Sequence, residues 1–105
     1  MLPQVVKRDG RREPFERDKI AAGLGIACRK RPIPVEQLDA LMDRVERRLS
    51  EKNEREVSAS VIGDLVLDEL RDVDDVAYLR FASVYLSFES LDEFVAEAAR
   101  VDRQR

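Results

Sequence analysis

Histidine and tryptophan are absent from this sequence of 105 residues, and cysteine occurs once. Without histidine, the Ser–His and Cys–His pairs of nucleophilic catalysis are excluded. The single cysteine, Cys28, cannot form a disulfide within the chain or supply a multi-cysteine zinc site. The sequence also contains neither a P-loop nor a G-x-G-x-x-G motif. We therefore predict that this chain is not an enzyme.

Long apolar runs are missing as well. No stretch approaches the roughly 18 consecutive apolar residues that span a membrane, and the N-terminus lacks the apolar core of a signal peptide. The length suits one domain, and a hydrophobic content of 44% allows a compact core. We expect a cytoplasmic protein without a membrane partner.

Charge is unevenly distributed along the chain. The formal net charge is −3, but residues 1–31 carry +5 and residues 32–105 carry −8. A basic N-terminal segment on an acidic body is consistent with a site for an anion. Mutual neutralisation of the two segments explains the same pattern, so charge alone leaves both interpretations open.

Near the N-terminus the sequence predicts a β-hairpin. Val5–Arg8 has the composition of a short strand, and Asp9-Gly10 is a strong signal for a two-residue turn. The returning strand would cover 11–15, and Val57 could add a third strand.

Apolar residues at helical spacing predict five helices in the rest of the chain. We expect Val35 in the buried stripe of the second helix, Ser58 and Asp74 as N-caps, and a capping box at Ser90–Glu93. The predicted fold is mainly α (α+β): a small helical bundle of about five helices capped by a short N-terminal β-hairpin or three-stranded sheet. The expected helices begin and end near residues 17–28, 34–51, 58–70, 76–88 and 91–100. The expected organisation is a lead of residues 1–4, one domain of residues 5–95, and a C-terminal helix end and tail of residues 96–105.

Three cations in the N-terminal segment are candidates for an anion site. A hairpin folded over the start of a helix would bring Lys7, Arg8 and Lys19 together, where they could hold the phosphates of a triphosphate. Glu13 would repel phosphates, so it would more plausibly accept a hydrogen bond from a base, from a ribose or from Arg8. A solvated basic hairpin without a ligand accounts for the same residues.

The same residues resemble a known family signature. Val5-Val6-Lys7-Arg8-Asp9-Gly10, followed by Glu13, Phe15 and Lys19, is similar to the signature of the ATP-cone, an allosteric module of ribonucleotide reductases and of their transcriptional repressor. The remaining chain resembles the repressor branch of that family. The segments that carry this second resemblance are residues 27–32, 76–85, 87–88 and 92–94.

The resemblance implies a ligand and a set of contacts. ATP or dATP would lie between the β-cover and the helices, and Mg²⁺ could accompany its phosphates. Lys7, Arg8 and Lys19 would hold the phosphates, and Glu13 would lie near the base or the sugar. Val5 or Val6 would line the base, and Ile20, Ser58 and Ile62 would form the pocket wall. The implied partners are adenine nucleotides and further copies of the chain, because nucleotide identity shifts the oligomeric state of these repressors and thereby controls transcription.

Three residues of the fourth predicted helix have two interpretations each. Tyr78, Arg80 and Tyr85 could contact a second nucleotide or a neighbouring cone, or they could belong to the core and its rim. Arg80 on an apolar helix needs an acidic partner or a phosphate.

The sequence departs from the repressor branch in two ways. The four-cysteine zinc ribbon that precedes the cone in that branch, and through which those repressors contact DNA, is not present in this chain. Leu86 stands where the branch usually has a basic residue. A degenerate cone that acts as an interaction module or as a partner of full-length repressor therefore stays open beside the nucleotide sensor, and direct binding of DNA by this chain is a third and less favoured hypothesis.

Overall fold

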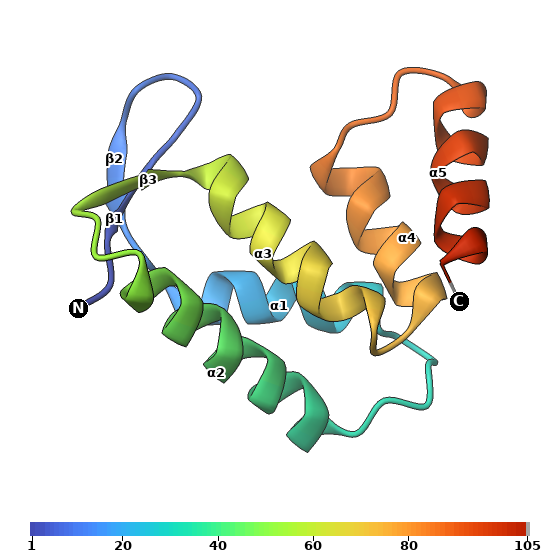
Figure 1. Cartoon of the computed structure of the whole chain (residues 1–105), viewed down its shortest axis with the longest axis horizontal. Helices are drawn as coiled ribbons and strands as arrows, with labels where there is room; N and C mark the ends of the chain where they lie inside the picture. Colours follow the sequence, from blue (N-terminus) through green and yellow to red (C-terminus); the bar gives the residue numbers. More distant parts are fainter. Residues whose placement is uncertain (105) are drawn as a thin grey trace.

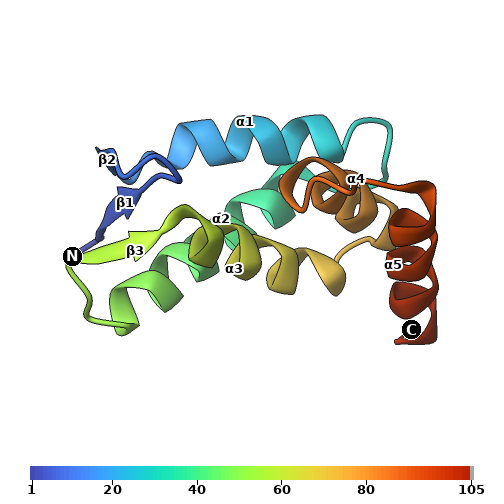
Figure 2. The same cartoon turned by 90° about the horizontal axis from the view of Figure 1, so that it is seen from above.

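The computed structural model describes residues 1–104, and it confirms the predicted mainly α fold with a small sheet. Figures 1 and 2 show the sheet at one end of the molecule, α5 at the opposite end, and the other helices between them. The strands are β1 (Gln4–Val6), β2 (Arg12–Pro14) and β3 (Glu56–Ser58). The helices are α1 (Arg17–Ala27), α2 (Val35–Glu51), α3 (Ala59–Arg71), α4 (Asp75–Tyr85) and α5 (Leu91–Arg103).

The three strands form one mixed sheet in the order β2-β1-β3. Val5 at the centre of β1 lies opposite Glu13 of the antiparallel strand β2 and opposite Val57 of the parallel strand β3. Val5 and Val57 are both buried, so the sheet turns its apolar side towards the helices. The predicted third strand at Val57 is confirmed, and it joins segments that are about fifty residues apart in the chain.

The hairpin turn differs from the predicted two-residue type. The Lys7 N–H donates to the Arg11 carbonyl at 2.8 Å, which leaves a loop of three residues, 8–10, between the paired positions. Gly10 has a φ of +88° and is the one loop residue in the left-handed region. A two-residue type I′ turn requires positive φ at both central positions, whereas a three-residue loop needs it only at its last residue, which is glycine here.

The core forms among the first four helices: α3 packs against α2 and α4, and α1 packs against the same two helices. Leu41, Val45 and Leu49 of α2 are almost fully buried, as their spacing along the chain predicted. Val35 was expected in the same stripe, but its side chain is 70% exposed. It is the first residue of α2, and it lies at the end of the helix that extends past the covering elements.

The predicted helix caps have mixed outcomes. The Asp74 carboxylate accepts a hydrogen bond from the Ala77 N–H at 2.8 Å, and the Ser90 hydroxyl accepts one from the Glu93 N–H at 3.1 Å, so both N-caps are confirmed. The reciprocal half of the predicted capping box is displaced by one residue, because the Glu93 carboxylate accepts from the Glu89 N–H at 2.8 Å and not from the Ser90 N–H. Ser58 occupies the N-cap position of α3 but makes no side-chain cap, because its hydroxyl is hydrogen-bonded to the Ser60 hydroxyl instead.

The C-terminal helices differ from prediction in length. α4 ends at Tyr85 rather than at residue 88, and Ser87 in the following turn has a φ of +52°. α5 continues past residue 100 to Arg103, and its buried residue is Val101. No helix among residues 1–104 has the length and apolar character needed to cross a membrane.

Candidate nucleotide site

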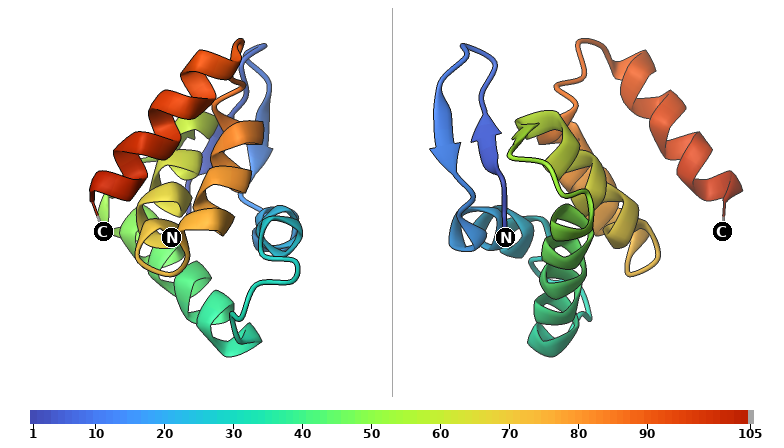
Figure 3. Two further views of the ribbon diagram at one scale, coloured as in Figure 1. Left: turned by 90° about the vertical axis from the view of Figure 1, so that its right-hand side faces the viewer. Right: turned by 60° about the vertical axis from the view of Figure 1, so that its left-hand side comes forward.

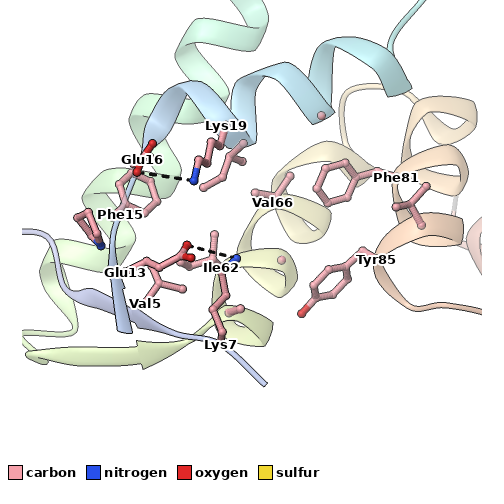
Figure 4. A pocket seen from close by; sticks show the side chains of 16 residues that line it. Val5, Lys7, Glu13, Phe15, Glu16, Lys19, Ile62, Val66, Phe81 and Tyr85 are labelled. Atoms are coloured by element: carbon pink, nitrogen blue, oxygen red, sulfur yellow. Dashed lines mark ion pairs between the residues drawn. The ribbon is translucent and has the colours of Figure 1, made fainter. Parts of the chain in front are cut away.

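A cleft of about 490 Å³ opens between the sheet and the helices α1, α3 and α4 (Figure 4). Its volume falls within the range of small-molecule pockets. Most of its wall is apolar, and Val5 forms part of it from the sheet. The other apolar side chains that line it include Phe15, Ile20, Ala59, Ile62, Val66, Phe81, Val84 and Tyr85. Predicted residues Val5, Ile20 and Ile62 therefore line one cavity together with Lys7, Glu13 and Lys19.

Lys7 and Lys19 reach this cleft from two different elements. Lys7 directly follows β1 and Lys19 lies in the first turn of α1, so the sheet-to-helix fold-back brings them to opposite sides of the opening (Figure 4). Each ammonium is near a carboxylate that also lines the cleft: Lys7 Nζ lies 3.7 Å from Glu13 Oε2, and Lys19 Nζ lies 3.7 Å from Glu16 Oε1. Both pairs are solvent-accessible, and such pairs are weak.

The predicted cluster of three cations is divided between two recesses. Arg8 lies outside the cleft and lines a neighbouring, more open recess together with Val6 and Ser58. Lys7 borders both cavities. The division follows from the alternation of side chains along a strand, which turns Val5 and Val6 to opposite faces of β1.

Tyr85 forms the wall that the two recesses share. Its hydroxyl donates a hydrogen bond to the Ser60 carbonyl in the first turn of α3. Its ring lies against Gly63, where a Cβ would overlap the ring atoms. Burial raises the pKa of Tyr85, and nearby Asp64 adds to the effect while Arg8 opposes it. The phenol therefore stays protonated at neutral pH and can keep this hydrogen bond.

Tyr78 and Arg80 lie away from the cleft. Tyr78 is 2% exposed, and its hydroxyl accepts a hydrogen bond from Arg100 Nη2 of α5 at 2.7 Å. Arg80 donates to the carbonyls of Ala27 and Arg29 at 3.2 and 2.7 Å. The expected acidic partner or phosphate is thus replaced by backbone carbonyls at the C-terminal end of α1, where the helix dipole favours a cation.

Sequence reasoning missed several lining residues. Glu16, Gly63, Val66 and Phe81 line the cleft but were not among the predicted site residues. Val66 and Phe81 read as core positions in a helical pattern, and the pattern does not show which core positions border a cavity. For Gly63 the sequence did carry a signal. A glycine within a helix costs about 1 kcal/mol relative to alanine, so its presence there indicates a close contact or another structural reason.

No catalytic or metal centre emerges from the described residues. Cys28 is buried, and burial raises the pKa of its thiol, which keeps it protonated and unreactive. Among residues 1–104, no three His, Cys, Asp or Glu side chains gather into a metal-binding group.

Comparison with known proteins agrees with this picture. Residues 3–91 match the family model described as ATP cone domain. The chain is 57% identical over 97 residues to the transcriptional repressor NrdR of Pelobacter propionicus, which covers 92% of this chain and 65% of that protein. It is 52% identical over 104 residues to NrdR of Anaeromyxobacter sp. (strain K), which covers 99% of this chain and 67% of that protein. It is 48% identical over 101 residues to NrdR of Sorangium cellulosum, which covers 96% of this chain and 66% of that protein.

The chain spans about two thirds of the length of these curated relatives. They are named as repressors and not as enzymes, in agreement with the prediction from the missing catalytic groups. The match covers both strands of the hairpin, the cleft and the four helices that surround or support it. By its sequence, this chain is therefore a member of the ATP-cone family, related to the NrdR repressors over almost its whole length.

Proposed function

We propose that this chain is a regulatory domain that binds ATP or dATP in the cleft under the sheet and does no chemistry on it. The observation that carries the proposal is the placement of Lys7 and Lys19 on two sides of one largely apolar cavity. An adenine ring suits the apolar wall, and a triphosphate suits the two ammonium groups at the opening.

The start of α1 supports the phosphate end of this proposal. Glu16 occupies the N-cap position of α1 but its side chain makes no cap hydrogen bond. The first-turn N–H groups are thus left without a side-chain acceptor, beside Lys19. Together with the positive end of the helix dipole they favour an anion.

Nucleotide entry requires an exchange of partners. The phosphates would take over Lys7 from Glu13 and Lys19 from Glu16, and both present pairs are weak because they are exposed to water. Glu13, once released from Lys7, would accept a hydrogen bond from the sugar or the base. Mg²⁺ would enter with the phosphates, where it would reduce the negative charge that faces the two carboxylates.

The regulatory part of the proposal rests on the relationship to NrdR. ATP and dATP would stabilise different assemblies of the chain, and the assembly would decide whether transcription of ribonucleotide reductase genes is repressed in the bacterial cytoplasm. Such a switch requires the two nucleotides to bind the two assemblies with different affinity. The two nucleotides differ by one 2′-hydroxyl, so the difference in binding free energy at a single site is small. In an oligomer with several linked sites, these small differences would sum.

Replacement of both cleft lysines tests the nucleotide site. In Lys7→Gln/Lys19→Gln we expect the affinity for ATP and dATP to fall at least about a hundredfold, since each charged hydrogen bond is worth about 1.5 kcal/mol or more. Isothermal titration calorimetry with and without MgCl₂ measures this. The matched control, Lys30→Gln/Lys52→Gln, removes the same charge from two exposed lysines that lie outside the cleft.

The outcomes separate the nucleotide sensor from the alternatives. Equal affinity of the cleft variant and the control would refute the proposal. No heat from the parent at millimolar nucleotide would favour the interaction module without nucleotide binding. A salt-dependent shift of promoter DNA by the chain alone would favour direct DNA binding.

A further inference from the structure

Arg17 begins α1 but is turned away from the nucleotide cleft, which it does not line. Its guanidinium binds α2 instead: Nη1 donates to Asp43 Oδ1 at 2.8 Å and to the Glu46 carboxylate, and Nη2 donates to the Asp39 carbonyl at 3.2 Å. Figure 3 shows α1 beside α2, with β2 leading into the start of α1. Arg17 therefore joins the first turn of α1 to one face of α2.

The attachment to α2 compensates an unfavourable position for a cation. The N-terminal end of a helix carries partial positive charge, so an arginine in the first turn is disfavoured unless acidic groups lie beside it. Asp43 and Glu46 supply these groups. The Arg17 and Glu46 side chains are 31% and 27% exposed. In the pair beside the cleft, Lys19 and Glu16 are 68% and 48% exposed, so water screens the attachment to α2 less than it screens that pair.

The apolar side chains at the start of α1 belong to the cleft. Phe15 and Ile20 are half-buried against the core, and both line the cleft, so their packing depends on what fills it. The first buried side chain of α1 is Leu24, about two helical turns after Arg17. The bonds of Arg17 to α2 lie outside the cleft and hold the start of the helix whether or not a ligand is present.

We infer that Arg17 is a positioning residue for the phosphate end of the nucleotide site: its bonds to Asp43 and Glu46 fix the first turn of α1, which carries Lys19 and the uncapped N–H groups. The inference rests on the proposed function and adds to it a role for α2, none of whose residues lines the cleft. Groups that are held in place before a ligand arrives bind it more tightly, because they lose little freedom on binding. Adenosine has no phosphates, so its affinity should not depend on Arg17.

Two variants break the attachment from opposite sides and change the net charge in opposite directions. Arg17→Met removes one positive charge, whereas Asp43→Asn/Glu46→Gln removes two negative charges and keeps Arg17. If Arg17 positions α1, both variants should bind ATP and inorganic tripolyphosphate about tenfold more weakly than the parent and bind adenosine as the parent does. If only net charge matters, the first variant should bind phosphates more weakly and the second more tightly. Calorimetry with MgCl₂ measures all three ligands.

Matched controls remove the same charges elsewhere. Arg44→Met and Asp68→Asn/Glu69→Gln break ion pairs between α2 and α3 that lie outside the cleft. We expect both controls to bind ATP within about twofold of the parent, because these charges act on the cleft only through screened, long-range fields. Circular dichroism verifies that every variant is folded.

Amide hydrogen exchange without nucleotide gives a second readout. The amides of residues 21–24 donate to the carbonyls of the first turn of α1 in a regular helix. They should exchange several-fold faster in both Arg17-attachment variants than in the parent, while the amides of α3 keep their rates.

The outcomes distinguish failure of this inference from failure of the nucleotide site. A parent that binds ATP while both variants bind it equally well, or a tighter ATP complex in Asp43→Asn/Glu46→Gln, would overturn the role of Arg17 and leave the site intact. An equal loss of adenosine affinity, or unchanged exchange at residues 21–24, would overturn it as well. A parent that binds neither ATP nor tripolyphosphate would reject the site and its positioning residue together.

Discussion

Gly63 and Tyr85 form the contact that ties α4 to the start of α3 at the wall of the cleft. A Cβ on Gly63 would overlap the Tyr85 ring, so in Gly63→Ala the ring has to leave its position. Its hydrogen bond to the Ser60 carbonyl is lost at the same time. Overpacking of this kind costs about 1–3 kcal/mol, whereas alanine in a helix is favoured over glycine by about 1 kcal/mol. The net expectation is a loss of about 1 kcal/mol in the free energy of unfolding.

The sign of this effect reverses when the ring is absent. In a Tyr85→Ala background the Gly63→Ala change meets no ring and should stabilise the protein by up to about 1 kcal/mol. Urea unfolding of the parent, the two single variants and the double variant gives the coupling free energy, which we expect to be about 1–3 kcal/mol. Additive effects within about 0.3 kcal/mol would refute the contact. Nucleotide calorimetry on the same four proteins shows whether the displaced ring also reshapes the cleft.

Two further predictions concern carboxylates. Burial raises the pKa of Asp74, but the first-turn N–H groups of α4 and the side chain of Arg31 outweigh it, so the net pKa lies below the ordinary 3.8. The stability from this group is therefore present above pH 3.8 and lost as the pH falls through the lowered value. Asp74→Ala should cost about 2 kcal/mol at pH 7, and this cost should shrink progressively as the pH falls below the ordinary 3.8. Urea unfolding along an acid series measures it, and a cost that stays equal throughout the series would contradict the cap. Glu16→Gln releases Lys19 from its ion pair, so the affinity for ATP, measured by calorimetry, should rise about threefold. The control Asp18→Asn removes a charge outside the cleft and should leave the affinity unchanged. Equal changes in both variants would show that Glu16 acts only through net charge.

The predicted helices were accurate where residue type and spacing act locally. The apolar stripe of α2 follows from the helical period, and the caps at Asp74 and Ser90 follow from short side chains that accept from nearby N–H groups. Local patterns failed at Ser58, because a second hydroxyl at Ser60 offered a competing partner. They failed at Val35, because an apolar residue on a helix does not reveal whether another element reaches it.

The sequence by itself determined the fold class, the order of the elements and the presence of Lys7, Glu13 and Lys19 near the N-terminus. These properties depend on residues that lie within a few turns or strand positions of one another. Only the tertiary structure decided that Lys7 and Lys19 share a cleft while Arg8 lies in the next recess. It also decided that Tyr85 fits against Gly63, a residue more than twenty positions away. Such contacts depend on how strands and helices pack in space. A periodic pattern along the chain shows which face of a helix is apolar, but it does not show which residue of another element lies against that face.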